Sequence, residues 1–282
     1  MFPSYTLSNG VSAPSIIVGT FQHRNEGDLN DLIRHAINHG YRAFDTAPSY
    51  QNELMLGNIF SSLLNEGNIR RKDLFLIDKI DGWQMHASKG DVRPYFEEAL
   101  RKLQLEYLDL LLIHWPFPEY LLETWDVFEQ IYNAGLARSI GLCNVEVRHL
   151  QRVIQQASIV PHVVQVERHP LNSVSDVITY CHKNGIVVQG YSPVCRMLPK
   201  VAASPVIEVI AEKYKKSKGQ IIMRWHFDTE VAPVFMTTRE ERLIEYADEV
   251  QSFRLDEGDI AAINGMNEDF KLFLGSRACP GY

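Results

Sequence analysis

Short apolar runs alternate with longer amphipathic segments from one end of the chain to the other. The apolar runs have the length and β-branched content of strands, and the longer segments repeat apolar residues at helical spacing. Strands are predicted at eight places: residues 16–20, 41–45, 74–79, 107–114, 137–142, 163–167, 186–191 and 232–236. Helices are predicted between and after them: residues 28–39, 52–66, 91–103, 120–134, 147–156, 173–184, 204–216 with 219–229, and 240–246.

The strands are apolar along most of their length, as at residues 108–113. Such strands are typical of a parallel sheet that helices cover on its faces. Eight β-α units in 282 residues predict an α/β fold, the (β/α)8 TIM barrel, which takes about 250 residues. No linker interrupts the repeat, so we expect a single domain over residues 1–282. An N-terminal β-hairpin is predicted at residues 5–13 as a plug of the barrel floor, and an extra C-terminal helix at residues 256–264.

The main alternative is a doubly wound nucleotide-binding sheet, whose first strand runs into a glycine-rich turn. Here the first strand is followed by Gly-Thr-Phe-Gln-His-Arg-Asn-Glu-Gly-Asp at residues 19–28, and neither GxGxxG nor GxxxxGKS occurs in the chain. A nucleotide cofactor would therefore have to be held in another way.

Composition narrows the class of partner. The chain is 45% hydrophobic and 22% charged, as in an ordinary globular protein. A net charge of −7 offers no field to attract a nucleic acid or an anionic membrane. No apolar run approaches the roughly 18 residues of a membrane helix, and the start of the chain lacks a signal-peptide pattern. We expect a cytoplasmic protein that binds a small molecule, with no nucleic-acid or membrane partner, as a monomer or weak homo-oligomer.

Metal binding and disulfides are not expected. Cys143, Cys181, Cys195 and Cys279 are far apart with no CxxC pair, so reduced thiols are predicted. His35 and His39 are four residues apart on a predicted helix, but the glutamate of HExxH is missing and no third ligand is evident.

Polar residues gather at the carboxyl ends of the predicted strands, where the loops of a barrel build its pocket. A buried lysine is costly unless paired, and Asp45 is the natural partner of Lys79 on the neighbouring strand. The Lys79 cation would lower the pKa of Tyr50, ordinarily about 10, and make it a better proton donor. His114 would give a second hydrogen bond to the same oxygen. This set suits carbonyl reduction, in which a cofactor supplies hydride and the protein supplies a proton.

Five segments in order carry a resemblance to a known family: residues 41–53, 105–116, 139–145, 165–170 and 190–194. Over nearly its whole length the chain resembles the aldo-keto reductases, barrel enzymes that use a nicotinamide cofactor. The resemblance implies reduction of an aldehyde or ketone to an alcohol by hydride transfer from NADPH or NADH. It assigns Tyr50 as the acid, Lys79 and Asp45 as the pair that tunes it, and His114 as the group that orients the substrate.

The resemblance also implies a cofactor site. The cofactor residues are Gly19, Thr20, Phe21, Asp45, Cys143, Asn144, Gln165, Tyr191, Ser192, Pro193, Val194, Met236, Thr237, Thr238, Arg242, Glu245 and Tyr246. In this set Asn144 and Gln165 hold the carboxamide, Tyr191 stacks on the nicotinamide, and Ser192 binds the pyrophosphate. Aromatic walls are usual in substrate pockets, so the predicted substrate residues are Phe21, Trp83 and Trp115 together with Tyr50 and His114.

The chain departs from the family at the phosphate site. Met236 replaces the lysine of the family's Ile-Pro-Lys-Ser stretch, and Thr237 replaces its serine, while Arg242 and Glu245 are retained and Tyr246 stands where asparagine is common. Loss of one charge from a 2'-phosphate site costs about 1–3 kcal/mol unless Arg239 compensates. We therefore hypothesise a weakened preference for NADPH, with NADH also used.

Two further positions depart from the family. Cys143 stands where serine is usual, and a thiol is a weak hydrogen-bonding group. In the third strand the family often has Lys-Leu-Trp, whereas this chain has Lys79-Ile80-Asp81. Asp81 either favours a polar or cationic substrate or caps the following loop, and the second interpretation is favoured about two to one.

Two other functions remain open at this point. Lys79 could form a Schiff base as a lyase does, although a lysine paired with Asp45 is a poor nucleophile. The barrel could instead be a catalytically weak nucleotide-binding protein that acts as a sensor or subunit. The tail after Asn264 is short, which predicts an open pocket, and Cys279 and Tyr282 either reach that pocket or pack on the barrel.

Overall fold

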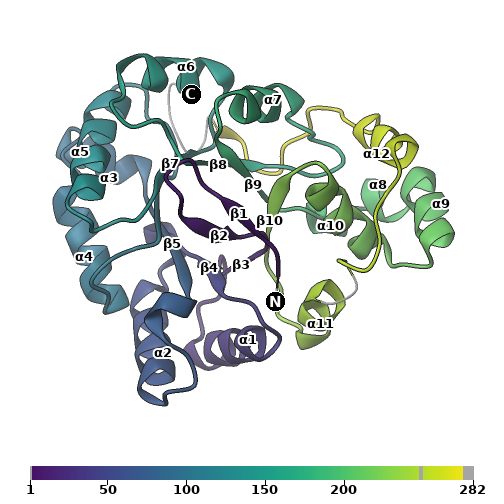
Figure 1. Cartoon of the computed structure of the whole chain (residues 1–282), viewed down its shortest axis with the longest axis horizontal. Coiled ribbons are helices and arrows are strands. Elements are labelled where there is room, and N and C mark those ends of the chain that lie inside the picture. Colours follow the sequence, from purple (N-terminus) through teal and green to yellow (C-terminus); the bar gives the residue numbers. More distant parts are fainter. Residues whose placement is uncertain (1, 248–249, 276–282) are drawn as a thin grey trace.

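The computed structural model describes residues 2–247 and 250–275. Eight parallel strands close into a barrel in the order β10-β3-β4-β5-β6-β7-β8-β9 (Figure 1). Their bounds are β3 Ile17–Gly19, β4 Ala43–Asp45, β5 Phe75–Ile80, β6 Leu110–Ile113, β7 Ile140–Cys143, β8 Val163–Glu167, β9 Val187–Tyr191 and β10 Val231–Phe235. The barrel closes where Val234 and Phe235 pair with Ile17 and Val18. Each strand overlaps a predicted run, with β5, β7 and β10 extending one residue beyond theirs, so the (β/α)8 prediction is confirmed.

Helices surround the barrel and follow each of its strands (Figure 1). Their bounds are α1 Glu26–Asn38, α2 Glu53–Asn65, α3 Gly82–Ser88, α4 Arg93–Leu103, α5 Leu121–Asn133, α6 Val147–Gln156, α7 Ser175–Lys183, α8 Pro199–Ala202, α9 Pro205–Tyr214, α10 Lys218–Asp228, α11 Glu240–Ala247 and α12 Glu257–Asn264. Short 3-10 turns are η1 Pro48–Tyr50, η2 Arg71–Asp73 and η3 Cys195–Met197. Helix α12 is the extra C-terminal helix that was predicted.

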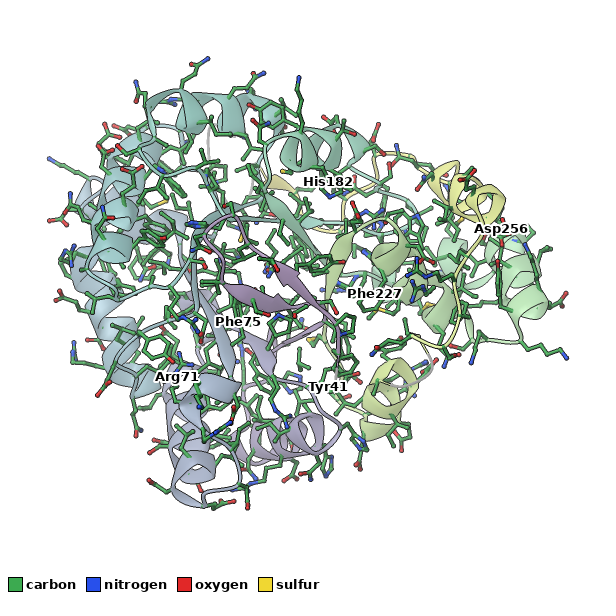
Figure 2. All side chains as sticks on the ribbon, in the orientation of Figure 1. Tyr41, Arg71, Phe75, His182, Phe227 and Asp256 are labelled. Atoms are coloured by element: carbon green, nitrogen blue, oxygen red, sulfur yellow. The ribbon has the colours of Figure 1, made fainter. Side chains whose placement is uncertain are left out.

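Side chains fill two apolar layers. Strand side chains alternate between faces, so Phe75 and Ile77 point into the barrel while Leu76 packs outward against the helices. Figure 2 shows how densely side chains occupy the space inside the barrel around Phe75. The barrel interior is therefore a packed core, and open space is left at its mouth.

The N-terminal hairpin consists of β1 Ser4–Thr6 and β2 Ser12–Pro14, paired antiparallel. It crosses the centre of the barrel in Figure 1. Leu7 and Ala13 are buried in the same cluster as the inward-facing strand residues, and the Asn9 side chain donates a 2.9 Å hydrogen bond to the carbonyl of Arg138. The hairpin thus closes the barrel floor, as predicted. Its turn uses Gly10 at a φ of +83°, a conformation that suits glycine.

Helix α3 was not predicted. It has seven residues, of which only Gly82, Gln84 and Met85 are buried, so no apolar stripe marks it in the sequence. The side chain of Gln84 accepts a 2.8 Å hydrogen bond from the backbone N–H of Asp81 at the start of the helix. Asp81 therefore begins a helix here, in line with the capping interpretation. Among the described residues, no helix has the length and apolar content needed to span a membrane.

Candidate active site

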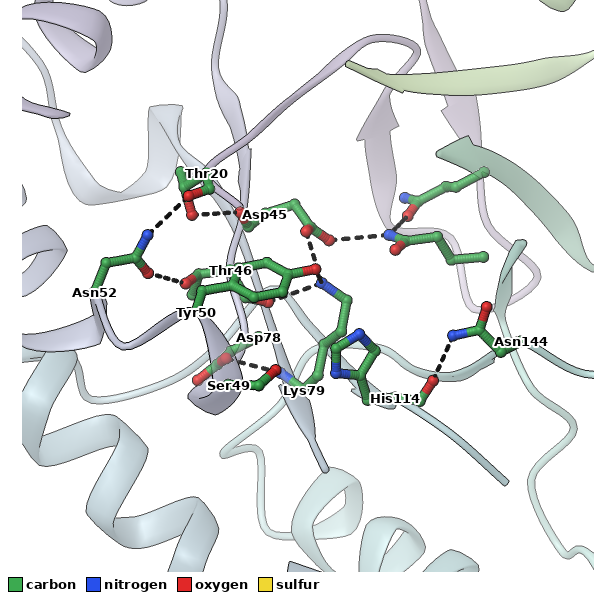
Figure 3. Close-up of polar contacts among 12 residues, drawn as sticks. Thr20, Asp45, Thr46, Ser49, Tyr50, Asn52, Asp78, Lys79, His114 and Asn144 are labelled. Atoms are coloured by element: carbon green, nitrogen blue, oxygen red, sulfur yellow. Dashed lines mark hydrogen bonds and ion pairs between the residues drawn. The ribbon is translucent and has the colours of Figure 1, made fainter. Parts of the chain in front are cut away.

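An ion pair lies at the mouth of the barrel, between the ends of β4 and β5 (Figure 3). Lys79 Nζ donates hydrogen bonds of 2.6 Å to Asp45 Oδ1 and 2.8 Å to the carbonyl of Thr46, and it lies 3.4 Å from Tyr50 Oη. The Lys79 side chain is completely buried. Burial acts to lower the pKa of Lys79, but the Asp45 carboxylate and the contact with Tyr50 outweigh it and the pKa is raised. Lys79 is therefore charged at neutral pH, which opposes a Schiff-base function.

Tyr50 is the last residue of the η1 turn, and Gln51, which follows it, has a left-handed backbone conformation. Its ring packs against Phe21 at 5.1 Å and meets the edge of His114 at 5.8 Å. Burial raises the pKa of Tyr50 above its ordinary value, while the charge of Lys79 acts to lower it. The net direction is opposite to the sequence prediction, because the burial of the phenol outweighs the nearby cation. Tyr50 consequently stays protonated at neutral pH, which is the form that a proton donor requires.

A hydrogen-bond network holds this arrangement in place. Gln165 Nε2 donates to Asp45 Oδ2 and to Gln189 Oε1, at 2.9 Å in each case. Asn52 Oδ1 accepts from Thr46 Oγ1 at 2.6 Å, and Asn52 Nδ2 donates to the carbonyl of Thr20 at 2.9 Å. Asn52 was not predicted as a site residue, although it lies two positions after Tyr50. These bonds fix the loop that carries the phenol.

His114 lies at the end of β6 and also lines the mouth. Its Nδ1 is 2.5 Å from Asp81 Oδ1, while its backbone carbonyl accepts a 2.8 Å hydrogen bond from Asn144 Nδ2. Tyr191 Oη donates in turn to Asn144 Oδ1 at 2.7 Å. The structure thus brings together all four residues of the predicted tetrad, and it connects His114 to two residues of the predicted cofactor site.

A long cavity of about 1200 Å³ runs from the tetrad across the ends of β9 and β10. It is larger than most small-ligand pockets, which suits an extended ligand. The predicted residues that line it are Gly19, Phe21, Asp45, Tyr50, His114, Trp115, Asn144, Gln165, Tyr191, Ser192, Pro193, Val194, Met236, Thr237, Thr238, Arg242 and Tyr246. The cavity therefore joins the tetrad to the predicted phosphate site.

Five predicted residues are placed outside this lining, and one of them is Lys79, which is fully buried against Asp45 and Tyr50. Thr20 is buried beneath the cavity, where its hydroxyl donates to the carbonyl of Asp45 at 2.9 Å. Cys143 is buried in the barrel interior, and burial raises the pKa of its thiol. Glu245 forms an ion pair with Arg242. Trp83 is 59% exposed and meets the edge of Tyr95, because α3 directs it away from the mouth.

The C-terminal segment of residues 269–274 forms part of the cavity wall. The Glu167 carboxylate accepts hydrogen bonds from the backbone N–H groups of Leu272 at 2.5 Å and Phe273 at 3.0 Å. The Phe273 ring meets Phe21 at 6.1 Å and Tyr191 at 5.8 Å. This segment therefore covers one side of the pocket, a wall that the expectation of an open pocket did not include. Cys279 and Tyr282 lie outside the described residues.

Other lining residues were missed at the sequence level. Arg196 and Met197 come from the η3 turn after β9, and Ser49 precedes Tyr50. Arg196 lies over the Phe273 ring, 5.3 Å from its centre. The apolar letters at residues 270–274 were the one available signal for the C-terminal wall. Within residues 2–247 and 250–275, no three His, Cys, Asp or Glu side chains are grouped to hold a metal.

A barrel with a charged lysine, a phenol and an imidazole at its mouth, beside a cavity for an extended ligand, is the arrangement of a barrel oxidoreductase. Comparisons with known proteins agree. The model of the Aldo/keto reductase family matches residues 15–268. An uncharacterized oxidoreductase, YtbE, of Bacillus subtilis (strain 168) is 36% identical and covers 95% of this chain and 94% of its own. Glyoxal reductase of the same organism is 35% identical, with 94% and 93% covered.

The solved structures point to the same family. The crystal structure of Bombyx mori aldo-keto reductase AKR2E4 in complex with NADP has a TM-score of 0.90 and 30% identity, and the match covers 98% of this chain and 96% of that one. The chain therefore belongs to the aldo/keto reductase family. It is an oxidoreductase that reduces a carbonyl group.

Proposed function

We propose that this enzyme reduces an aldehyde or ketone to the alcohol with NAD(P)H, and that Tyr50 donates the proton. The observation that carries the proposal is the position of Lys79 Nζ, bound to Asp45 and 3.4 Å from Tyr50 Oη at the cavity mouth. A charged lysine beside the phenol stabilises the phenolate that remains after proton transfer. The Lys79–Asp45 pair thus serves the proton donor rather than the fold alone.

The residues along the cavity fit a dinucleotide. The Tyr191 ring and the side-chain amides of Asn144 and Gln165 lie close to the tetrad, which suits an aromatic ring that carries a carboxamide. Arg239 and Arg242 line the other part of the cavity, beside Thr237, which suits phosphate groups. The nicotinamide, when bound, supplies the hydride. NADPH is the expected cofactor, as in the silkworm relative solved with NADP.

The chain's own groups handle the proton. As the carbonyl carbon accepts the hydride, the electron pair of the C=O double bond moves onto oxygen, and that oxygen takes the proton of Tyr50 Oη. His114 lines the cavity next to Tyr50 and is placed to hold the same oxygen. The carbonyl compound is reduced, the nicotinamide is oxidised, and the remaining phenolate faces the Lys79 cation.

The substrate is a small carbonyl compound. Phe21, Trp115 and Phe273 give the mouth aromatic walls, while Arg196 and Lys271 add positive charge. Relatives are named as glyoxal reductase and methylglyoxal reductase, so we propose small aldehydes and dicarbonyls as the first compounds to test. We also propose, from composition alone, that the enzyme acts in the cytoplasm as a monomer or weak homo-oligomer.

A nicotinamide-absorbance screen of diverse carbonyls with NADPH and NADH tests the function, with Tyr50→Phe as the matched variant. Removal of the phenol hydroxyl should lower kcat about 100-fold or more and leave nucleotide binding intact. Unchanged reduction by Tyr50→Phe would refute its role as the acid. Tight nucleotide binding without turnover of any carbonyl would favour the sensor or subunit function instead.

A further inference from the structure

Asp81 lies directly behind His114, at the boundary between β5 and α3. Its Oδ1 is 2.5 Å from His114 Nδ1, and both side chains are largely buried, with 6% and 14% of their surfaces exposed. Asp81 is absent from the lining of the cavity, whereas His114 lines it. The carboxylate therefore contacts the inner edge of the imidazole and leaves the other edge to the cavity.

The surroundings of Asp81 keep its carboxylate ionised. The backbone N–H of Ser49 donates to Oδ2 at 2.9 Å, and the Ser49 hydroxyl donates to Oδ1 at 3.3 Å. Burial acts to raise the pKa of Asp81, but the hydrogen bonds from His114 and Ser49 outweigh it and the pKa is lowered. An ionised carboxylate only accepts hydrogen bonds. The proton between Asp81 and His114 must therefore be on Nδ1.

We propose that Asp81 is a positioning residue for carbonyl reduction, which fixes a proton on Nδ1 of His114 and so turns Nε2 toward the substrate. The inference rests on the proposed function of this site. The Asp81 oxygens are occupied by Ser49 and His114, which favours this role over the selection of a cationic substrate.

The fixed proton determines what Nε2 can do. A neutral imidazole with its proton on Nδ1 has only a lone pair at Nε2, so it can accept a hydrogen bond from an alcohol but cannot donate one to a carbonyl. Donation to a carbonyl oxygen requires the imidazolium, which carries protons on both nitrogens. The Asp81 carboxylate stabilises that cation. A hydrogen bond from Nε2 to a carbonyl oxygen therefore needs a second ring proton, whereas a hydrogen bond from an alcohol to Nε2 does not.

Other ionisable groups surround this ring, and Asp81 is the one paired with it. Lys79 and Asp45 compensate each other at 2.6 Å, and burial raises the pKa of both Tyr50 and Cys143, which keeps them uncharged. A second, smaller cavity adjoins the first and shares Trp115, Asn144 and Tyr191 with it. Further ionisable groups that line one or both cavities are Glu146, Glu167, Asp176, Tyr191, Arg196, Arg239, Arg242, Tyr246, Asp269 and Lys271.

The first test needs no activity. Two-bond proton–nitrogen NMR on isotope-labelled histidine reports which ring nitrogen carries the proton, and the signal missing from His114→Gln assigns His114. The wild-type protein should show the proton on Nδ1 at high pH, and Asp81→Ala should shift the population toward Nε2. A wild-type His114 with its proton on Nε2 alone would overturn the proposal, whether or not any carbonyl is reduced.

The second test uses the pH profile of kcat/KM. Asp81→Asn keeps the shape and an acceptor oxygen but removes the charge, so the decline of carbonyl reduction with rising pH should move to lower pH. At neutral pH the loss should be about tenfold, and the low-pH plateau should be nearly retained. Asp81→Glu should restore most of the wild-type profile, since it restores the charge.

A matched control separates positioning from stability. Asp109 is also a buried aspartate, but it pairs with Arg71 at 2.7 Å and Arg138 at 3.2 Å, and it is absent from the cavity lining. Asp109→Asn should lower Tm without moving the pH profile. An Asp81→Asn profile that coincides with the wild type would overturn the proposal, as would an equal shift in Asp109→Asn. Absence of any carbonyl turnover by the wild-type enzyme would instead count against the proposed function.

Discussion

At the scale of single residues, the site depends on side chains that are buried and charged at once. Lys79 and Asp45 are both almost fully buried, and removal of one partner of such a pair typically costs about 3–5 kcal/mol. The geometry that makes Tyr50 a proton donor is therefore part of the core. Met236 is the contrasting case, because it is 43% exposed and lines the outer part of the cavity.

The cofactor preference is predicted to change with Met236. Arg239 and Arg242 line this end of the cavity, and the guanidinium of Arg242 is shared with Glu245. Without a lysine at position 236, the wild-type enzyme should bind NADPH less than tenfold more tightly than NADH. Met236→Lys adds a charge at the proposed 2'-phosphate site and should favour NADPH by about tenfold more. Titration of both nucleotides measures the ratio.

Ile244→Lys is the matched control for this change. Ile244 is 47% exposed on the neighbouring helix α11 but is absent from the cavity lining, so it adds the same charge without a phosphate contact. An equal shift in both variants would point to a general field effect. A wild-type preference of tenfold or more for NADPH would contradict the hypothesis outright.

The tetrad could be predicted from single residues of the sequence, whereas the residues that contact the tetrad could not. Asp45, Lys79 and His114 end successive apolar strands, so the barrel geometry alone places them together. The contact between Asp81 and His114 depends on how α3 begins after β5, which no periodic pattern fixes. The same holds for Trp83, whose position after Lys79 indicated a pocket wall but whose ring turns to Tyr95.

At the scale of elements, strands were predicted more reliably than connections. Parallel strands buried on both faces are recognisable as apolar runs, whereas the cavity wall at residues 269–274 has no secondary structure to give it a period. The Glu167 carboxylate at the end of β8 accepts hydrogen bonds from two successive backbone N–H groups of that wall, and the carbonyl of Leu171 accepts one from the backbone N–H of Phe270. Glu167 therefore links a barrel strand to a segment more than 100 residues later.

Loss of this link is predicted to loosen the wall. Glu167→Gln keeps an acceptor oxygen but loses the charge, so the hydrogen bonds to Leu272 and Phe273 weaken. We expect KM for the carbonyl substrate to rise about fivefold to tenfold with a smaller change in kcat, and we expect faster tryptic cleavage after Lys271. Steady-state kinetics and limited proteolysis measure the two effects.

Glu268→Gln provides the comparison, because Glu268 lies just before the same segment and forms an exposed ion pair with Lys200. Exposed pairs contribute little to stability, so this variant should behave as the wild type does. Equal cleavage rates in the wild type and Glu167→Gln would show that the carboxylate does not hold the wall.

At the scale of the whole molecule, buried histidines couple folding to pH. Burial lowers the pKa of His162, and burial together with Arg168 lowers the pKa of His226 well below its ordinary value. Both are neutral in the folded state but take up a proton when the chain unfolds at a pH below about 6.5. The stability they allow is therefore fully present above that pH and is lost as the pH falls toward their folded pKa values.

Thermal stability is predicted to fall between about pH 7 and pH 5, by up to about 1.4 kcal/mol per pH unit for each such histidine. Calorimetry across this range measures the slope. His162→Gln should reduce the slope of the unfolding free energy against pH by the contribution of one proton. His182→Gln, at an exposed position on α7 (Figure 2), should leave the slope unchanged. A slope unchanged by His162→Gln would show that another group governs acid stability.

Because the hairpin closes the barrel floor, the ligands are expected to bind and leave in a fixed order. Leu7 and Ala13 pack among the inward-facing strand residues and block the floor. The nucleotide and the carbonyl compound must therefore both enter through the mouth of the barrel. Tyr191 and Asn144 line the cavity at this mouth, beside the tetrad. A nucleotide bound there would form one wall of the pocket that the carbonyl compound enters. The alcohol product must therefore leave before the nucleotide can, and the slower of these two release steps sets the turnover rate.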